Sequence, residues 1–172
     1  MGEVRLPAGG LVEFRRAIEE AAGKDAVRAL REAGRRLAAD AEVILTERGG
    51  VPLPALSMND FWEQLNRYFE DSGWGHVEHE ALGNGVGAVV ARGWAEADPN
   101  ESRGAPGCHI STGLLAELLT RAVGQPVAVM EVACHSQGDD VCRFLFGAPT
   151  VLLLVHRKLA QSASLEDALA AL

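Results

Sequence analysis

The chain has 172 residues, which is enough for one domain with its own hydrophobic core. Hydrophobic residues make up 48% of it and charged residues 23%, a composition typical of soluble globular proteins. The formal net charge of -8 argues against a general binder of nucleic acids or anionic membranes, because both are polyanions. No apolar run approaches the length of a membrane span, and residues 1–10 lack the apolar core of a secretory signal, so we expect a cytoplasmic protein.

Three amphipathic helices are predicted in the first part of the chain, because apolar residues recur there at helical spacing. The first covers 11–21, the second runs from Asp25, its expected N-cap, to Gly49, and the third covers 58–69. The first helix has the apolar stripe Leu11, Phe14, Ile18 and Ala21. The second has the stripe Val27, Leu30, Ala33, Leu37, Ala41 and Ile44. The alanine-rich face of the second helix, with Gly34, could pack closely on another helix, including one from a second subunit.

The sequence period then changes to that of strands. Strand-like runs at 74–81 and 86–91 flank Asn84 and Gly85, a pair that favours a tight hairpin turn because both residues tolerate positive φ. A polar loop rich in turn residues follows at 99–107.

A compact amphipathic helix is predicted next, over 114–123, and Ser111, Thr112 and Gly113 precede it. The runs 127–133 and 141–146 predict a second hairpin, and short helices are expected at 152–160 and after Ser164. Helices and antiparallel hairpins in this order favour an α+β domain, with the N-terminal helices packed on an antiparallel sheet and a Cys-bearing C-terminal hairpin. We divide the expected single domain, 1–172, into a helical extension (1–24), a core (25–150) and C-terminal helices (151–172).

The three cysteines are the strongest chemical signal. Cys134 and Cys142 flank a Gly-Asp-Asp turn, so the predicted hairpin brings both sulfurs to one place. Cys108 lies just before the predicted helix, and Glu131 precedes Cys134 by three residues. In a reducing cytosol an odd number of cysteines does not favour a disulfide framework. Two interpretations stay open: a tetrahedral metal site, and three buried, chemically inert thiols.

A metal site on these residues makes one demand on the backbone. In a regular strand Glu131 and Cys134 would point to opposite faces, so a bulge or an early turn must bring them together. His109, His135, Asp139 and Asp140 are competing ligands, and either His109 or His135 could replace Glu131.

The tail resembles the C-terminal signature of the 4-vinyl reductase domain family; it reads EVACHSQGDDVCRFLFG from Glu131 to Gly147. The segment from Val27 to Arg35 looks like the N-terminal helix of that family, so the resemblance covers about residues 25 to 150. The family includes sensory domains of aromatic-responsive bacterial transcription activators. It is related in fold to the small subunits of the vesicle-tethering complex TRAPP.

The resemblance implies a structural zinc ion on Cys108, Glu131, Cys134 and Cys142, matched one by one to the ligands of the phenol-sensing members. Such a closed four-ligand site would hold the hairpin to the helix and shape a neighbouring pocket without activating water. The resemblance also implies an aromatic ligand bound through a His and a Trp. Candidate ligand-binding residues are Trp94, Trp74, His76, Phe61 and Tyr68, with Trp62 and His79 as further candidates; each aromatic could equally be ordinary core.

The function expected from these observations is binding or sensing of a small hydrophobic or aromatic molecule by a homodimer. The sequence has no GxxxxGKS/T loop and no basic helix-turn-helix, so it would act through a separate signalling or effector protein. One alternative is an assembly protein of the tethering-subunit type. Another is a tetrapyrrole-related reductase accessory protein, although no nucleotide-binding motif or nucleophile elbow supports catalysis.

Overall fold

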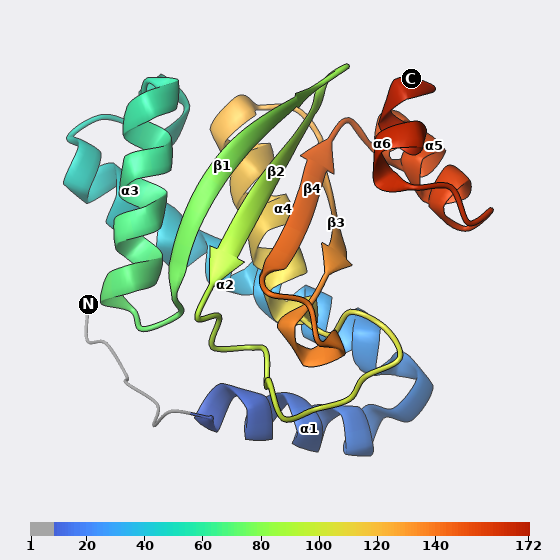
Figure 1. Cartoon of the computed structure of the whole chain (residues 1–172). Helices are drawn as coiled ribbons and strands as arrows, with labels where there is room; N and C mark the ends of the chain where they lie inside the picture. The colour runs from blue at the N-terminus through green and yellow to red at the C-terminus, as the bar shows by residue number, and fades with distance from the viewer. Residues whose placement is uncertain (1–8) are drawn as a thin grey trace.

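A computed structural model describes residues 9–172, and it has the α+β fold that the sequence predicts. Residues 1–8, on which most of the expectation about a secretory signal rests, lie outside the described residues. Helices from the first part of the chain pack on a four-stranded antiparallel sheet, and two short helices follow the last strand (Figure 1).

The three N-terminal helices form where the apolar spacing predicts them. They are α1 (Gly10–Ala22), α2 (Ala26–Gly49) and α3 (Met58–Asp71). The turn between α1 and α2 is a 3-10 helix over Gly23–Asp25, and a second one over Leu53–Ala55 precedes α3. Ser57 caps α3, because its side-chain oxygen accepts a hydrogen bond of 3.1 Å from the N–H of Asp60.

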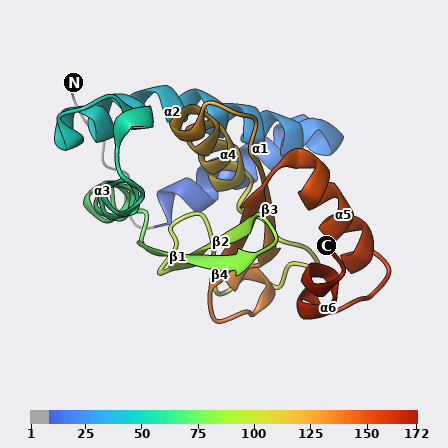
Figure 2. The same ribbon diagram turned by 90° about the horizontal axis from the view of Figure 1, so that it is seen from above.

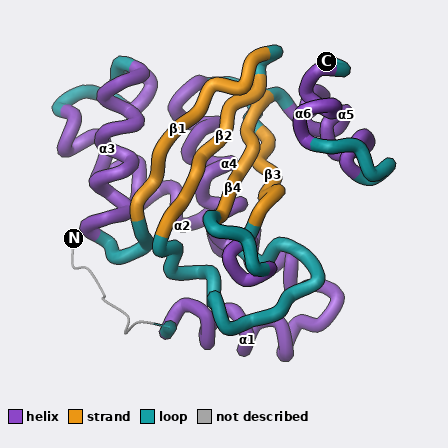
Figure 3. The backbone as a smooth tube through the Cα atoms, viewed as in Figure 1, coloured by secondary structure: helices purple, strands orange, loops and turns teal. Residues whose placement is uncertain are grey.

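Two hairpins make the sheet. The first joins β1 (His76–Gly83) to β2 (Val86–Arg92), and the second joins β3 (Ala128–Ala133) to β4 (Cys142–Gly147). The strand order is β1-β2-β4-β3, so β2 and β4 pair in the centre and β3 lies at one edge (Figure 3). Asn84 and Gly85 turn the first hairpin with φ of 52° and 74°, as their residue types predict.

The sheet separates two apolar layers. On one face lie α2, α3 and α4 (His109–Val123), and their main apolar cluster includes Phe69, Val89, Leu115 and Phe144. On the other face α5 (Pro149–Leu159) and α6 (Leu165–Ala170) cover a smaller cluster, toward the β3 side (Figure 2). Along residues 9–172, no helix combines the length and the apolar character that crossing a membrane requires.

The face of α2 that is buried against α4 differs from the apolar stripe that the sequence predicted. The buried side chains of α2 are small or aliphatic: Ala26, Leu30, Gly34, Ala38, Ala41 and Leu45. Val27 and Leu37, which we expected inside, are 42% and 40% exposed. The buried face is shifted because α2 approaches α4 through its small residues, and Gly34 meets the backbone of Ile110 in the same chain.

Candidate metal centre and ligand pocket

Three cysteines and one glutamate meet at one end of the sheet. Cys108 is the N-cap residue of α4, Glu131 lies on β3, Cys134 follows β3, and Cys142 begins β4. One ligand atom from each of the four lies within 4.8 Å of all the others. All three cysteines are buried and none is in a disulfide.

A register shift in β3 makes this cluster possible. Glu131 pairs with Phe144 of β4, but Ala133 pairs with Arg143, so one extra residue is accommodated between them. Without the shift, regular alternation would turn Cys134 away from Glu131. The sequence predicted that a bulge or an early turn must occur here, and the pairing confirms it.

The spacing of the sulfurs fits a tetrahedral metal. Cys108 Sγ lies 3.8 Å from both Cys134 Sγ and Cys142 Sγ. A zinc ion with Zn–S bonds of about 2.3 Å would place tetrahedral sulfur ligands about 3.8 Å apart. Glu131 Oε2 accepts a 2.8 Å hydrogen bond from the Cys108 N–H, while Glu131 Oε1 is buried and has no hydrogen-bond partner. That oxygen is therefore free to become the fourth ligand.

The electrostatics of the cluster favour a cation. Burial, followed by the charge of Cys134, raises the pKa of Glu131 to about 8. Contacts with Cys134 and Cys142, and then burial, raise the pKa of Cys108, whereas hydrogen bonds from the other two thiols lower that of Cys134. Several negative charges cannot share this buried volume unless a positive ion compensates them, and a divalent metal would do so.

Neither competing histidine joins the four clustered residues of the described chain. His135 Nδ1 lies 2.8 Å from the carbonyl oxygen of Asp139, and its backbone N–H points to Cys142 Sγ at 3.4 Å. His109 has a buried Nδ1 without a partner, and burial, with the charges of Arg31 and Arg103, lowers its pKa to about 4. Asp139 accepts a 2.8 Å hydrogen bond from the Cys134 N–H through its carboxylate.

Glu96 is a buried residue that the sequence analysis missed. It is fully buried, and its carboxylate accepts hydrogen bonds of 2.7 Å from the N–H groups of Ile110 and Ser111. It thereby satisfies the first turn of α4, next to Cys108. Burial raises the pKa of Glu96 to about 7. No local pattern marks this role, because the acid and the helix it caps are separated by a loop.

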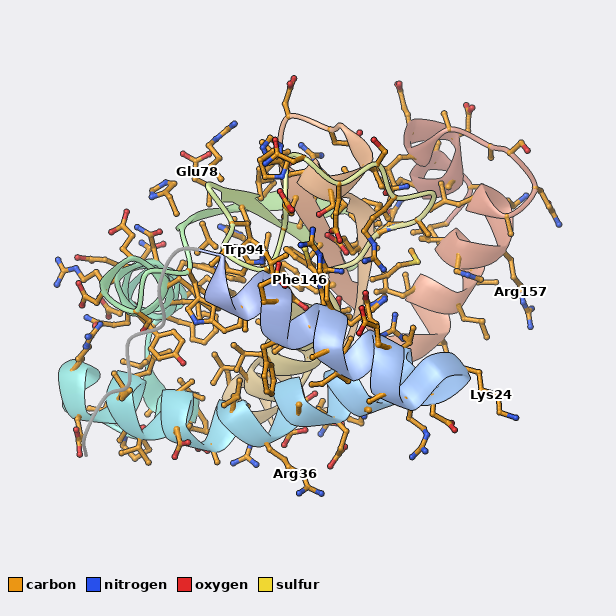
Figure 4. All side chains as sticks on the ribbon, turned by 90° about the horizontal axis from the view of Figure 1, so that it is seen from below. Lys24, Arg36, Glu78, Trp94, Phe146 and Arg157 are labelled. Carbon is orange, nitrogen blue, oxygen red and sulfur yellow. The ribbon has the colours of Figure 1, made fainter. Side chains whose placement is uncertain are left out.

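Trp94, a candidate ligand-binding residue, lies in the interior of the protein (Figure 4). It is 3% exposed, and its Nε1–H donates a 2.8 Å hydrogen bond to Ser111 Oγ. Its ring packs against Phe69 and Trp74, with centroids 4.9 and 5.6 Å away. Tyr68 also contacts Phe69, at 5.2 Å. These three candidates therefore lie in one aromatic cluster.

The other two candidates are placed differently. His76 lies 2.8 Å from Glu70 through Nδ1, and this hydrogen bond raises the pKa of His76. Phe61 faces an apolar pocket of about 310 Å³ between α3, the end of α4 and the end of β4. Trp62, which stacks on His79 at 4.6 Å, lines the same pocket. The remaining lining is Leu53, Leu56, Met58, Gly85, Leu119, Ala122, Val123, Val127, Phe146, Gly147 and Ala148.

The pocket and the cysteine cluster lie at opposite ends of β4. Cys142 begins that strand, and Gly147, which lines the pocket, ends it. Six strand residues span roughly 17 Å, so an ion at the cluster would not touch a molecule in this pocket. A different cavity, of about 620 Å³ on the α5 and α6 side, has Glu131 among its lining residues. The cavity next to the cysteine cluster is therefore this one and not the apolar pocket.

Comparison with known proteins agrees with these observations. Residues 95–148, which contain all four clustered residues, match the model of the V4R domain. Comparison with curated protein sequences gives no match.

Three solved structures share the fold at low sequence identity. The phenol-responsive sensory domain of the transcription activator PoxR, with phenol, is 17% identical with a TM-score of 0.65, over 84% of this chain and 76% of that one. A vinyl-4-reductase family protein from Methanocaldococcus jannaschii is 21% identical with a TM-score of 0.53, over 84% and 82%. Trafficking protein particle complex subunit 3 from Naegleria fowleri, covalently bound to palmitic acid, is 16% identical with a TM-score of 0.61, over 80% and 92%. Residues 95–148 therefore match the V4R domain, the chain shares the fold of a vinyl-4-reductase family protein and of a TRAPP subunit, and the resemblance predicted from the sequence is confirmed.

Proposed function

We propose that this chain is a sensory module that binds a small apolar molecule in the pocket between α3, α4 and β4. The observation that carries the proposal is the lining of that pocket, which contains no charged side chain and is almost wholly aliphatic and aromatic. Ligand sites typically have this character, and the volume of about 310 Å³ suits a small molecule. The fold shared with a phenol-responsive sensory domain supports the same function.

The lining also indicates which ligand property matters. Among the lining side chains, the indole N–H of Trp62 is buried without a hydrogen-bond partner, and the others are hydrocarbon or thioether. Binding is therefore driven by apolar surface. Each added CH2 that fits should contribute about 0.8 kcal/mol, or roughly a fourfold fall in Kd.

The test is a ligand series measured by tryptophan fluorescence, because Trp62 lines the pocket. Toluene, ethylbenzene and propylbenzene should bind with increasing affinity. Ala122→Phe should fill the pocket and raise the Kd of propylbenzene at least tenfold. Ala39→Phe, on the exposed side of α2, is the matched control and should leave it unchanged. Equal Kd values in both variants would contradict the proposal.

We further propose that the cysteine cluster holds zinc, with Cys108, Cys134, Cys142 and Glu131 as ligands. Thiolate and carboxylate ligands in a tetrahedral arrangement suit zinc, and four protein ligands leave no open position for water or substrate. The support is the 3.8 Å sulfur spacing and the buried, unpartnered Glu131 Oε1. The ion would supply cross-linking, because it would tie the start of α4 to both strands of the second hairpin.

The partners belong to the same proposal. The exposed apolar side chains Phe14, Val27 and Leu37 on α1 and α2 favour a homodimer, and the signal would pass to a separate protein. The cytoplasmic location stays a prediction from the sequence. An assembly role of the tethering-subunit type is the second candidate, and the same exposed side chains favour it.

A further inference from the structure

Helix α1 docks on the rest of the protein with its charged side. Its buried residues are Val12 and Arg15. Phe14, in the apolar stripe that an amphipathic helix would normally bury, is 55% exposed. Within the described chain, neither apolar cluster includes Leu11, Phe14 or Ile18. Apolar packing therefore contributes little to the attachment of α1.

Ion pairs attach α1 to the loop that leads to Cys108. They join Arg15, Arg16 and Glu19 of α1 to Asp98, Glu101 and Arg103 of the loop. The Arg15 guanidinium lies between Glu19, at 3.1 Å, and Glu101, at 2.5 Å. Figure 1 shows α1 running alongside this loop, beneath the end of the sheet.

The attachment of α1 depends on the loop carboxylates and on the salt concentration. Arg15 is fully buried and its Nε has no hydrogen-bond partner, so docking carries a desolvation cost that the carboxylates must offset. The Arg16 and Arg103 pairs are partly exposed, and salt screens such pairs. The packing of α2 on α4 is apolar and close, and salt does not weaken it in this way.

The chain around α1 is arranged so that the helix can detach as a unit. Gly23, with φ of 52°, separates α1 from α2 and supplies a hinge. The loop is held at its other side by Ser136, which accepts hydrogen bonds from the N–H of Asp98 through Oγ (2.8 Å) and from the N–H of Arg103 through its carbonyl (3.0 Å). Ser136 lies two residues after Cys134. The loop is thus connected to the cysteine cluster at two points, because it leads to Cys108 and is hydrogen-bonded to Ser136, near Cys134. If the loop moved, both parts of the cluster would be displaced.

We propose that α1 is a salt-sensitive latch: it binds loop residues 98–103 through ion pairs and dissociates from them when the pairs are broken, while the core formed by α2, α4 and the sheet stays folded. The latch does not depend on the proposed ligand. A change in salt concentration would then alter the conformation of the loop that leads to Cys108. A charged partner that binds Asp98 and Glu101 in place of α1 would have the same effect.

Hydrogen–deuterium exchange of the full chain, read by mass spectrometry, tests the latch. Between 0.05 and 1 M NaCl, amides of 10–22 and 98–103 should exchange roughly tenfold faster, because several ion pairs weaken together. Amides of α2 and α4 should not change, and they serve as the internal reference. Equal responses of α1 and α2 to salt, or none in either, would overturn the proposal.

A variant pair sharpens the result. Glu101→Gln removes the carboxylate shared by Arg15 and Arg16, so α1 should exchange about tenfold faster at low salt, with a smaller further response to salt. Glu32→Gln, which breaks an exposed pair with Arg36 on α2, should behave as wild type. Unchanged α1 exchange in Glu101→Gln would contradict the latch. If that variant does not fold, the wild-type salt titration decides without a substitution.

Discussion

At the crossing of α2 and α4, two glycines leave no room for a methyl group. A Cβ on Gly34 would lie 2.0 Å from the carbonyl oxygen of Ile110, and one on Gly113 would lie 2.0 Å from that of Arg31. Both obstacles are backbone atoms, so no rotamer change could relieve the contact. Each glycine therefore allows the two helix backbones to touch.

Gly113→Ala should consequently destabilise the protein. Alanine favours the helix by about 1 kcal/mol over glycine, but forcing two packed helices apart costs more, so we expect a net loss of about 2 kcal/mol. Chemical denaturation with urea measures it. Gly104→Ala is the matched control, because a Cβ there meets nothing within 4 Å, and it should unfold like wild type. A Gly113→Ala variant as stable as this control would contradict the prediction, because it would mean that α2 and α4 can move apart without a loss of stability.

At the scale of elements, α4 links the two sites. Its first turn meets Glu96 and the cysteine cluster, and Leu119, Ala122 and Val123 near its end line the apolar pocket. Glu96 is the carboxylate that satisfies the start of this helix. Because burial raises its pKa from 4.5 to about 7, its protonation is coupled to folding.

The sign of this coupling can be predicted. Between pH 4.5 and about 7 the folded state holds a proton on Glu96 that the unfolded state has released, so the free energy of unfolding falls as pH rises. A shift of this size corresponds to about 3 kcal/mol across the window. Stabilisation from Glu96 is complete below pH 4.5 and is lost by about pH 7.

Urea denaturation of wild type and Glu96→Gln at several pH values tests this prediction. The difference between the two proteins should change by about 3 kcal/mol over the window, because glutamine does not titrate. All other titrating groups are common to both proteins and cancel. A difference that is constant with pH would contradict the role of Glu96.

At the scale of the whole molecule, the proposed zinc site cross-links three separate parts of the chain. Removing the metal with a chelator should lower the Tm and cost several kcal/mol of unfolding free energy, because metal binding and folding are coupled. Cys142→Ser should lose the metal and reproduce this loss. His135→Ala should keep both metal and Tm, because its Nδ1 contacts the Asp139 carbonyl oxygen and not the cluster.

Metal content by mass spectrometry and Tm by scanning calorimetry measure the two effects. One zinc per wild-type chain and none in Cys142→Ser is the expected result. Retention of zinc by Cys142→Ser, or its loss from His135→Ala, would mean that the ligand set differs from the one we propose.

The sequence predicted the features that depend on short stretches of chain. The helices, the two hairpins and the Asn84 turn follow from local periodicity and turn chemistry, and all are present. The meeting of Cys134 with Cys142 also follows locally, since a hairpin must bring its two ends together. The bulge beside Glu131 could be anticipated because strand alternation would otherwise separate that carboxylate from Cys134.

By itself, then, the sequence determined the α+β class, the order of the elements and the meeting of Cys134 with Cys142, because each is encoded by spacing along the chain. Only the tertiary structure decided which faces are buried. It placed Trp94 in the core, turned Val27 and Leu37 outward and docked α1 through Arg15. It also put the apolar pocket at the far end of β4 from the cluster. These outcomes depend on which surfaces meet and how closely, and helix periodicity carries no information about the partner that a helix will contact.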